Sequence, residues 1–239
     1  MKVHPRIHLS FDQTWKLFLE GQLKDLTEID ELPEDMGKDL CQQLSKMYHF
    51  MPSYDSLYQN ESAPKWMLKN DSREEITFFG GTFNPWHQGH RQCLDLCPQK
   101  NIMVVPDLNP WKQKEISGEC RWKVFKSLCM ELKDTDYSIY PGFLGLDMAN
   151  PTIDWLPKVS IPLKNLIIGD DNFFSIDKWK ESAELLAHLH ILYVCPRLGD
   201  ERDKEKQSEK LLQLCPDLRI EFLEHHAFES VSSTALRKK

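Results

Sequence analysis

From residue 75 onward, short apolar runs alternate with stretches in which polar and apolar residues are mixed. The runs are rich in β-branched and aromatic residues and cover residues 76–79, 102–105, 137–140, 166–168, 191–194 and 220–223. Four helix-compatible stretches lie between them, at 91–97, 121–132, 176–186 and 204–215. Such alternation every ~25–35 residues predicts a parallel sheet with helical crossovers. Nearly continuous apolarity indicates strands covered on both faces, so we predict an α/β fold with a doubly wound parallel sheet.

The first part of the chain has a different pattern. Residues 14–26 carry apolar side chains at helical spacing, and residues 35–51 do the same. Residues 52–73 are polar and contain two prolines, which favours a loop or linker. We therefore expect two domains: a helical N-terminal extension over 1–74 and the α/β domain over 75–239.

Composition narrows the class of protein further. Hydrophobic residues make up 41% and charged residues 28% of the chain, a balance typical of a globular protein with a substantial core. No run approaches the ~18 apolar residues of a membrane-spanning helix, and the N-terminus lacks the apolar region of a secretory signal. The net charge of −7 argues against a nucleic-acid partner. We expect a cytoplasmic protein with no membrane contact.

The seven cysteines support the same compartment. Their number is odd and no Cys-x-x-Cys occurs. In a chain without an export signal, this usage predicts reduced and mostly buried thiols.

The residues best suited to ligand binding and catalysis follow directly after the apolar run at residues 76–79. That run leads directly into Gly80 and Gly81, where the absence of a Cβ lets the backbone approach a ligand closely. Pro85 breaks any early helix, and His87 and His90 follow at a spacing that places both imidazoles on one helix face. A helix N-terminus favours anions. Two imidazole donors beside it suit a phosphate that gains charge in a transition state.

The same helix offers an alternative, a metal site. His87, His90, Cys93 and Cys97 fall on one face, and zinc favours such ligands. Residues 87 and 97 are, however, ~15 Å apart along an ideal helix. We therefore predict no protein-bound metal and expect both cysteines to pack against the sheet.

A second candidate segment lies near residue 237. Ser232, Ser233 and Thr234 are residue types that cap helix starts, where phosphates bind. Arg237, one turn further on, can reach the same phosphate oxygens with its planar, charged guanidinium.

These two segments carry a family resemblance. Gly80-Gly-Thr-Phe-Asn-Pro-Trp-His-Gln-Gly-His90 resembles the signature loop of the HxGH nucleotidyltransferases, especially the nicotinate- and nicotinamide-nucleotide adenylyltransferases. Val231-Ser-Ser-Thr-Ala-Leu-Arg237 resembles the second signature of the same family. Two motifs in the family's order are far more specific than either alone. The resemblance covers residues 75–239 and implies a Rossmann-like fold.

The resemblance also implies an activity. Such enzymes move AMP from ATP, with Mg²⁺, to a pyridine mononucleotide and release pyrophosphate, a step of NAD biosynthesis. The partners would be ATP and nicotinate or nicotinamide mononucleotide, and the catalytic residues would be His87, His90 and Arg237. ATP-binding residues would lie in the two motifs and in weaker matches between them: Gly80, Gly81, Thr82, Phe83, Lys112, Gly169, Asp171, Arg197, Ser232, Ser233 and Thr234. Lys114 competes with Lys112 for its role, and Asp170 is interpreted as an exposed acid.

The mononucleotide site follows from the resemblance as well. Asn84, Thr152 and Trp179 would bind the acceptor, with Trp179 stacked on the pyridine ring. Pro151 and Trp155 depart from the family's tyrosine and threonine. The choice between nicotinate and nicotinamide therefore stays open.

Several alternatives also stay open. One is another HxGH nucleotidyltransferase, of the pantetheine-phosphate adenylyltransferase or cytidylyltransferase type. A second is a catalytically weak nucleotide sensor whose output is carried by residues 1–74. The sequence is compatible with a homo-oligomer. As a hypothesis for the extension, we expect residues 1–74 to brace the short final helix or to cover the active site.

Overall fold

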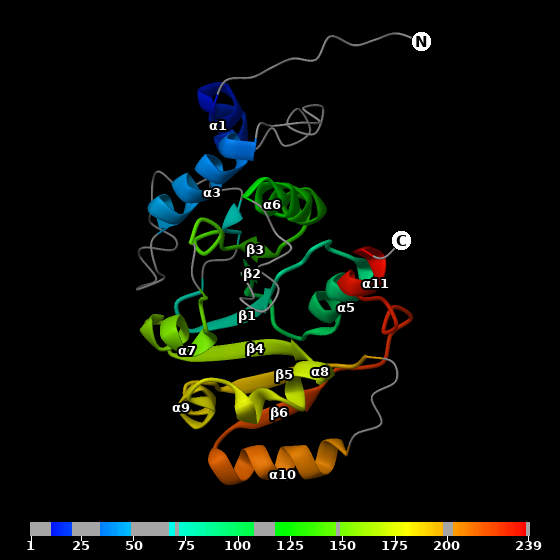
Figure 1. Ribbon diagram of the computed structural model, residues 1–239. Coiled ribbons are helices and arrows are strands. Elements are labelled where there is room, and N and C mark those ends of the chain that lie inside the picture. Colours follow the sequence, from blue (N-terminus) through cyan, green and yellow to red (C-terminus); the bar gives the residue numbers. More distant parts are fainter. Residues whose placement is uncertain are drawn as a thin grey trace.

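The computed structural model describes residues 11–20, 34–48, 67–69, 72–107, 118–146, 149–197 and 203–237. Their strands are β1 (Glu75–Gly81), β2 (Ile102–Pro106), β3 (Ser138–Ile139), β4 (Leu163–Gly169), β5 (Ile191–Cys195) and β6 (Arg219–Phe222). They form one six-stranded sheet of order β3-β2-β1-β4-β5-β6, in which each pairing is parallel. The predicted α/β fold, a Rossmann-like doubly wound sheet, is confirmed (Figure 1).

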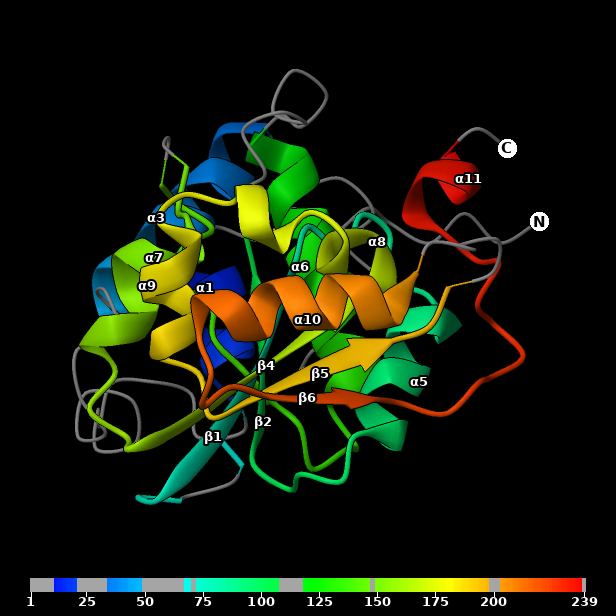
Figure 2. The same cartoon turned by 90° about the horizontal axis from the view of Figure 1, so that it is seen from below.

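The apolar runs explain why these strands form where they do. Every residue of β2 and of β5 is buried, as is each residue from Ile76 to Phe79 in β1. Only strands covered on both sides need such continuous apolarity. Helices α5 and α10 lie on opposite sides of β5 and β6 (Figure 2).

The helices agree with the sequence pattern in most places. The longer ones are α1 (Phe11–Leu19), α3 (Glu34–Tyr48), α5 (Gln88–Leu96), α6 (Gly118–Leu132) and α10 (Lys204–Leu214). Shorter pieces are α7 (Thr152–Trp155), η3 (Leu156–Lys158), α8 (Asp170–Phe173), η4 (Ile176–Lys178), α9 (Ser182–Ala187) and α11 (Ser233–Arg237). In the described ranges, none of these helices has the length and apolarity needed to cross a bilayer.

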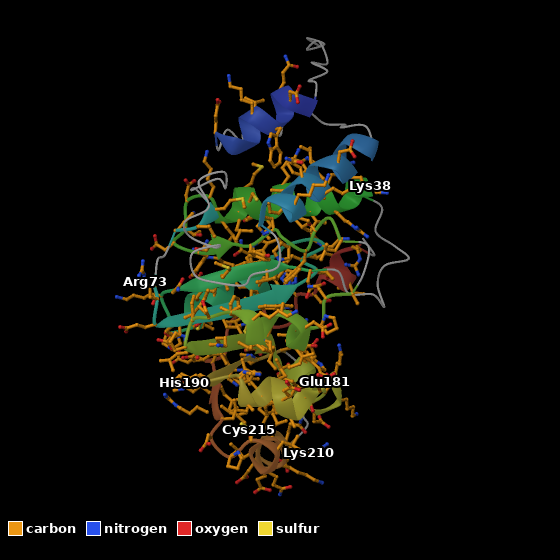
Figure 3. The ribbon with its side chains drawn as sticks, turned by 90° about the vertical axis from the view of Figure 1, so that its left-hand side faces the viewer. Lys38, Arg73, Glu181, His190, Lys210 and Cys215 are labelled. Carbon is orange, nitrogen blue, oxygen red and sulfur yellow. A yellow bond between two sulfur atoms is a disulfide. The ribbon has the colours of Figure 1, made fainter. Side chains whose placement is uncertain are left out.

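The single helix predicted over 176–186 is wrong. The chain makes η4, then a turn, and only then α9. Glu181, at the N-cap of α9, has a φ of 49°, a left-handed conformation that a continuous right-handed helix excludes (Figure 3). The turn places Trp179 outside any helix.

The strand order creates a crevice in the middle of the sheet. The chain runs from β1 outward to β2 and β3, and then returns to place β4 on the other side of β1. β1 and β4 stay paired, but the chain connections that follow them lead to opposite halves of the sheet. In open α/β sheets, ligands bind beyond the carboxyl ends of the strands at this point.

The described part of the N-terminal extension packs on α6. Leu40, Cys41 and Leu44 of α3 are fully buried and belong to the same hydrophobic cluster as the sheet. The backbone N–H of Gly145 donates a 2.8 Å hydrogen bond to Ser45 Oγ. Lys38 on α3 and Lys210 on α10 mark opposite ends of the molecule (Figure 3). In Figure 1, α3 is also well separated from α11, so this helix does not brace it.

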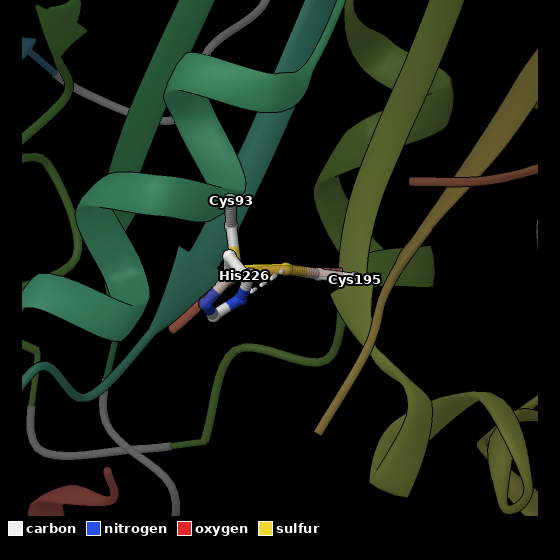
Figure 4. Close-up of side chains that lie close together, drawn as sticks. All are labelled: Cys93, Cys195 and His226. Atoms are coloured by element: carbon white, nitrogen blue, oxygen red, sulfur yellow. Dashed lines mark hydrogen bonds between the residues drawn. A yellow bond between two sulfur atoms is a disulfide. The ribbon is translucent and has the colours of Figure 1, made fainter. Parts of the chain in front are cut away.

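One cysteine pair contradicts the expectation of reduced thiols. Cys93 of α5 and Cys195 at the end of β5 form a disulfide, with Cα atoms 5.7 Å apart (Figure 4). The two residues are 102 positions apart in sequence and meet only because α5 packs against the sheet. Cys41, Cys97, Cys129 and Cys215 carry free thiols. Cys93 and Cys97 are both buried, as predicted.

Candidate active site

A cavity of about 730 Å³ opens at the carboxyl ends of β1 and β4. The predicted site residues that line it come from widely separated parts of the chain: Gly80, Gly81, Thr82, Phe83, His90, Thr152, Gly169, Asp171, Trp179, Arg197, Ser232, Ser233 and Thr234. His87, Asn84 and Arg237 lie beside it without lining it. Lys112 and its competitor Lys114 fall outside the described residues.

The glycine loop is compact because its aromatic residues fold over one another. β1 ends at Gly81, and Phe83 then adopts a φ of 45°. The Phe83 ring is buried and packs on the rings of Phe79, Trp86 and His90, with centroids 5.1–5.3 Å away. Trp86, a bulky residue for such a loop, thereby forms part of the floor on which His90 rests.

His87 and His90 stack at the start of α5. Their ring centroids are 3.7 Å apart, and the planes differ by 21°. The backbone N–H of His87 donates to Nδ1 of His90 at 3.3 Å. Nδ1 of His90 therefore carries no hydrogen in this arrangement, and Nε2 bears the N–H of the neutral ring. His90 offers this donor from a ring that lines the cavity.

His87, unlike His90, does not line the cavity. It is the N-cap residue of α5 and is only 8% exposed. Burial, together with the smaller effect of the nearby positive charge of Arg197, lowers the pKa of His87 to about 4. His87 is therefore neutral at pH 7, and it supports the ring of His90 by stacking.

This shift predicts a pH dependence of stability. The pKa of His87 is lower in the folded state than the unfolded value of 6.5, so the unfolded chain binds a proton first as the pH falls. Stability should decline from pH 7 to pH 5 by about 2 kcal/mol through this group. Urea unfolding at both pH values should show a smaller decline for His87→Asn than for His188→Asn. Equal declines in the two variants would contradict the assignment.

The final helix closes one side of the cavity. Ser233 Oγ donates to the carbonyl oxygen of Pro85 at 2.9 Å. Arg237 donates through Nη1 to the carbonyl oxygen of Asn84 and through Nη2 to Thr234 Oγ1. The bonds to Pro85 and Asn84 form a clasp between the two sequence motifs. The clasp gives the five-residue α11 the tertiary support that so short a helix needs.

A buried acid connects two segments that line the cavity. Asp170 is 1% exposed, so its interpretation as an exposed acid is wrong. Its Oδ2 accepts a 2.9 Å hydrogen bond from the backbone N–H of Arg197. Arg197 in turn lies with its Nε 3.4 Å from Asp171 Oδ1, and both of these side chains line the cavity. Asp170 thus connects the end of β4 to the end of β5.

Two lysines and a tryptophan that are adjacent in sequence also line the cavity. Half-buried Trp179 lies between Lys178 and Lys180 in the chain, and all three line the cavity together with Thr152. Lys180 Nζ is paired with Asp154 Oδ1 at 2.6 Å. These two lysines could not be singled out from the sequence, because no motif or spacing distinguishes them from other lysines of the chain.

Comparisons with known proteins are consistent with this geometry. A family model described as cytidylyltransferase-like matches residues 78–239. The probable nicotinate-nucleotide adenylyltransferase of Leptospira interrogans is 28% identical over 172 residues, which cover 67% of this chain and 82% of that protein. Its counterpart from Nitratiruptor sp. is 30% identical over 155 residues, covering 60% and 84%. Plasmodium falciparum nicotinic acid mononucleotide adenylyltransferase, solved with NaAD, shares the fold with a TM-score of 0.51 at 20% identity, covering 69% and 83%.

Proposed function

Because the chain belongs to the cytidylyltransferase-like family and is thus a nucleotidyltransferase, we propose that it transfers AMP from ATP to a pyridine mononucleotide, releasing pyrophosphate. The observation that carries the proposal is the meeting of two motifs at one cavity. His90 and Ser232–Thr234 line it together, and the clasp to Pro85 holds them in place. The names of the relatives point to the same reaction, a step of NAD biosynthesis.

The reaction requires positioning and charge stabilisation more than covalent chemistry by the protein. The phosphate of the mononucleotide attacks the α-phosphorus of ATP, and pyrophosphate leaves. Nε2–H of His90 would donate to the α-phosphate oxygens as they gain charge. The hydroxyls of Ser232 and Thr234 and the exposed backbone at Gly80 would hold the remaining phosphates. Arg237 would act through the clasp, by fixing the loop that carries the histidines.

Mg²⁺ enters as the ion that ATP brings with it. Asp107 and Asp171 both line the cavity and supply the oxygen ligands that this ion prefers. Because Mg²⁺ is usually held by one or two carboxylates plus substrate phosphates, this donor set fits it. The ion would neutralise phosphate charge.

The acceptor end supports nicotinate mononucleotide as the substrate. Trp179 offers a flat face for the pyridine ring. Lys178, which lines the same cavity, supplies positive charge, which stabilises a carboxylate more than a neutral amide. The charge of Lys180 is already balanced by Asp154. The relatives named nicotinate-nucleotide adenylyltransferases agree with this choice.

Pyrophosphate release in the presence of ATP, Mg²⁺ and each mononucleotide tests the proposal. We expect kcat/KM for nicotinate mononucleotide to exceed that for nicotinamide mononucleotide by at least about tenfold. ATP binding without turnover on either acceptor would favour a nucleotide sensor instead. Turnover with phosphopantetheine, or with CTP in place of ATP, would assign the chain to another branch of the family.

A further inference from the structure

A disulfide with a histidine beside it lies outside the cavity and takes no part in the proposed reaction. Nε2 of His226 is 3.7 Å from Cys195 Sγ, and the sulfur atoms of Cys93 and Cys195 are bonded (Figure 4). All three residues lie within one small cluster. Cys93 is 8% exposed and Cys195 is 1% exposed, so an external thiol reaches Cys93 more easily.

The cluster joins three elements that build the cavity. Cys93 lies one turn after His90 on α5, and its Sγ is 3.1 Å from the carbonyl oxygen of Gly89. Cys195 is the last residue of β5, two positions before Arg197. His226 begins the segment that leads to α11. A bond between Cys93 and Cys195 therefore fixes the helix that carries the histidine pair to the strand end that carries Arg197.

The hydrogen bonds of His226 decide what this cluster can do. Its Nδ1 accepts a 3.1 Å bond from the backbone N–H of Phe228. A neutral ring with an acceptor at Nδ1 carries its hydrogen on Nε2, and that N–H is the atom that faces Cys195 Sγ. Glu229 holds the segment, because its Oε1 accepts from the backbone N–H of His226 at 2.9 Å.

The same observation argues against a metal. Two cysteines and a histidine resemble a partial zinc site. A histidine that binds zinc through Nε2 must carry its hydrogen on Nδ1, and it normally donates that hydrogen to an oxygen. Here Nδ1 faces a donor instead. The arrangement suits a sulfur that receives a hydrogen bond from Nε2–H, and not a metal ligand.

We propose that Cys93 and Cys195 form a reversible thiol–disulfide exchange site, with His226 assisting the departure of Cys195. A dithiol reductant attacks Cys93 Sγ as the thiolate, forming a mixed disulfide. The Cys93–Cys195 bond breaks, and Cys195 leaves as a thiolate that is stabilised by a hydrogen bond from Nε2–H of His226 and then takes a proton from solvent. The second thiol of the reductant then displaces Cys93 and closes the reductant's own disulfide. Two protein thiols and one oxidised reductant result, and a small-molecule or protein disulfide reverses the sequence.

The exchange should also change the cavity, a consequence that rests on the proposed function. Reduction removes the covalent link between α5 and β5, and so loosens the position of His90 relative to Arg197. Coupling through such a contact is worth roughly a 2- to 30-fold change. We expect the oxidised protein to be the more active form by a factor in this range.

The exchange itself is measured without any assay of AMP transfer. The folded protein is incubated with dithiothreitol or with glutathione buffers, alkylated, and analysed by mass spectrometry for the state of each cysteine. The Cys93–Cys195 pair should open and reform while circular dichroism stays native. His226→Ala should slow reduction roughly threefold or more, because a leaving thiol with a higher pKa departs more slowly. His225→Ala is the matched control, since His225 contacts the same Glu229 but does not face the sulfur.

Several results would overturn the proposal. A pair that opens only when the protein unfolds would be a purely structural disulfide. Stoichiometric zinc in the reduced protein, lost in His226→Ala, would make the cluster a metal site.

The coupling between the disulfide and the cavity needs a separate test. The activity and the ATP affinity of both redox forms are compared with those of Cys93→Ser and Cys97→Ser. Cys97→Ser should keep the redox response and Cys93→Ser should lose it, whereas equal ATP affinity and activity in both forms of the protein would refute the coupling. If the thiol–disulfide exchange is reversible but the protein does not transfer AMP, the proposed function is refuted and the exchange site is not.

Discussion

Replacing His90 by alanine is expected to lower kcat for AMP transfer by about 10²- to 10³-fold, the effect of losing one preorganised donor to a transition-state oxygen. His90 lines the cavity, and the backbone N–H of His87 fixes its Nδ1 as an acceptor. Its remaining N–H is therefore held in one orientation before the substrate binds. Because the donor acts mainly on charge that develops during the reaction, KM for ATP should change much less than kcat.

Steady-state kinetics of His90→Ala and His188→Ala give the comparison. His188 lies at the C-cap of α9, outside the cavity lining, and its replacement should leave kcat unchanged. Thermal unfolding of both variants checks that the fold is retained. If His90→Ala keeps wild-type kcat, the proton donor for the α-phosphate must be sought elsewhere in the cavity.

Replacing Trp179 by alanine should raise KM for the mononucleotide by roughly 5- to 150-fold, the range that corresponds to ~1–3 kcal/mol of stacking on an aromatic side chain. Trp179 lines the cavity together with both phosphate-binding motifs and is flanked in sequence by Lys178 and Lys180. KM for ATP should stay close to its wild-type value, since the tryptophan contacts only the acceptor in this proposal.

Trp179→Phe provides the matched variant. Phenylalanine keeps an aromatic face, so its KM for the mononucleotide should lie between those of the wild type and Trp179→Ala. Equal rises in KM for ATP and for the mononucleotide would indicate that Trp179 shapes the cavity as a whole and does not stack on the pyridine ring.

The sheet could be predicted from the sequence because burial on both faces leaves continuous apolar runs, as in β2 and β5. The turn at Glu181 could not, because helical spacing of apolar residues continues across it. The pairing of Cys93 with Cys195 could not be predicted either. It depends on how α5 packs against the sheet, and the local sequence contains no pattern that indicates this packing.

The candidate site was only partly predictable for a related reason. Motif spacing brings His87 and His90 to one helix face, but it cannot tell which ring lines the cavity and which is stacked behind it. The burial of Asp170 depends on the neighbouring strand, since its partner is the backbone N–H of Arg197. Local sequence shows the residue types, and tertiary packing decides their exposure and their pKa.

The clasp between Ser233 and Pro85 has a consequence for truncated chains. All six strands lie before residue 223, so the pairing that builds the sheet uses no residue of the final motif. The loop at 84–85, in contrast, depends on a partner that is 148 residues downstream. A chain that stops short of Ser233 would therefore retain every strand of the sheet and lack the clasp that holds the loop at 84–85.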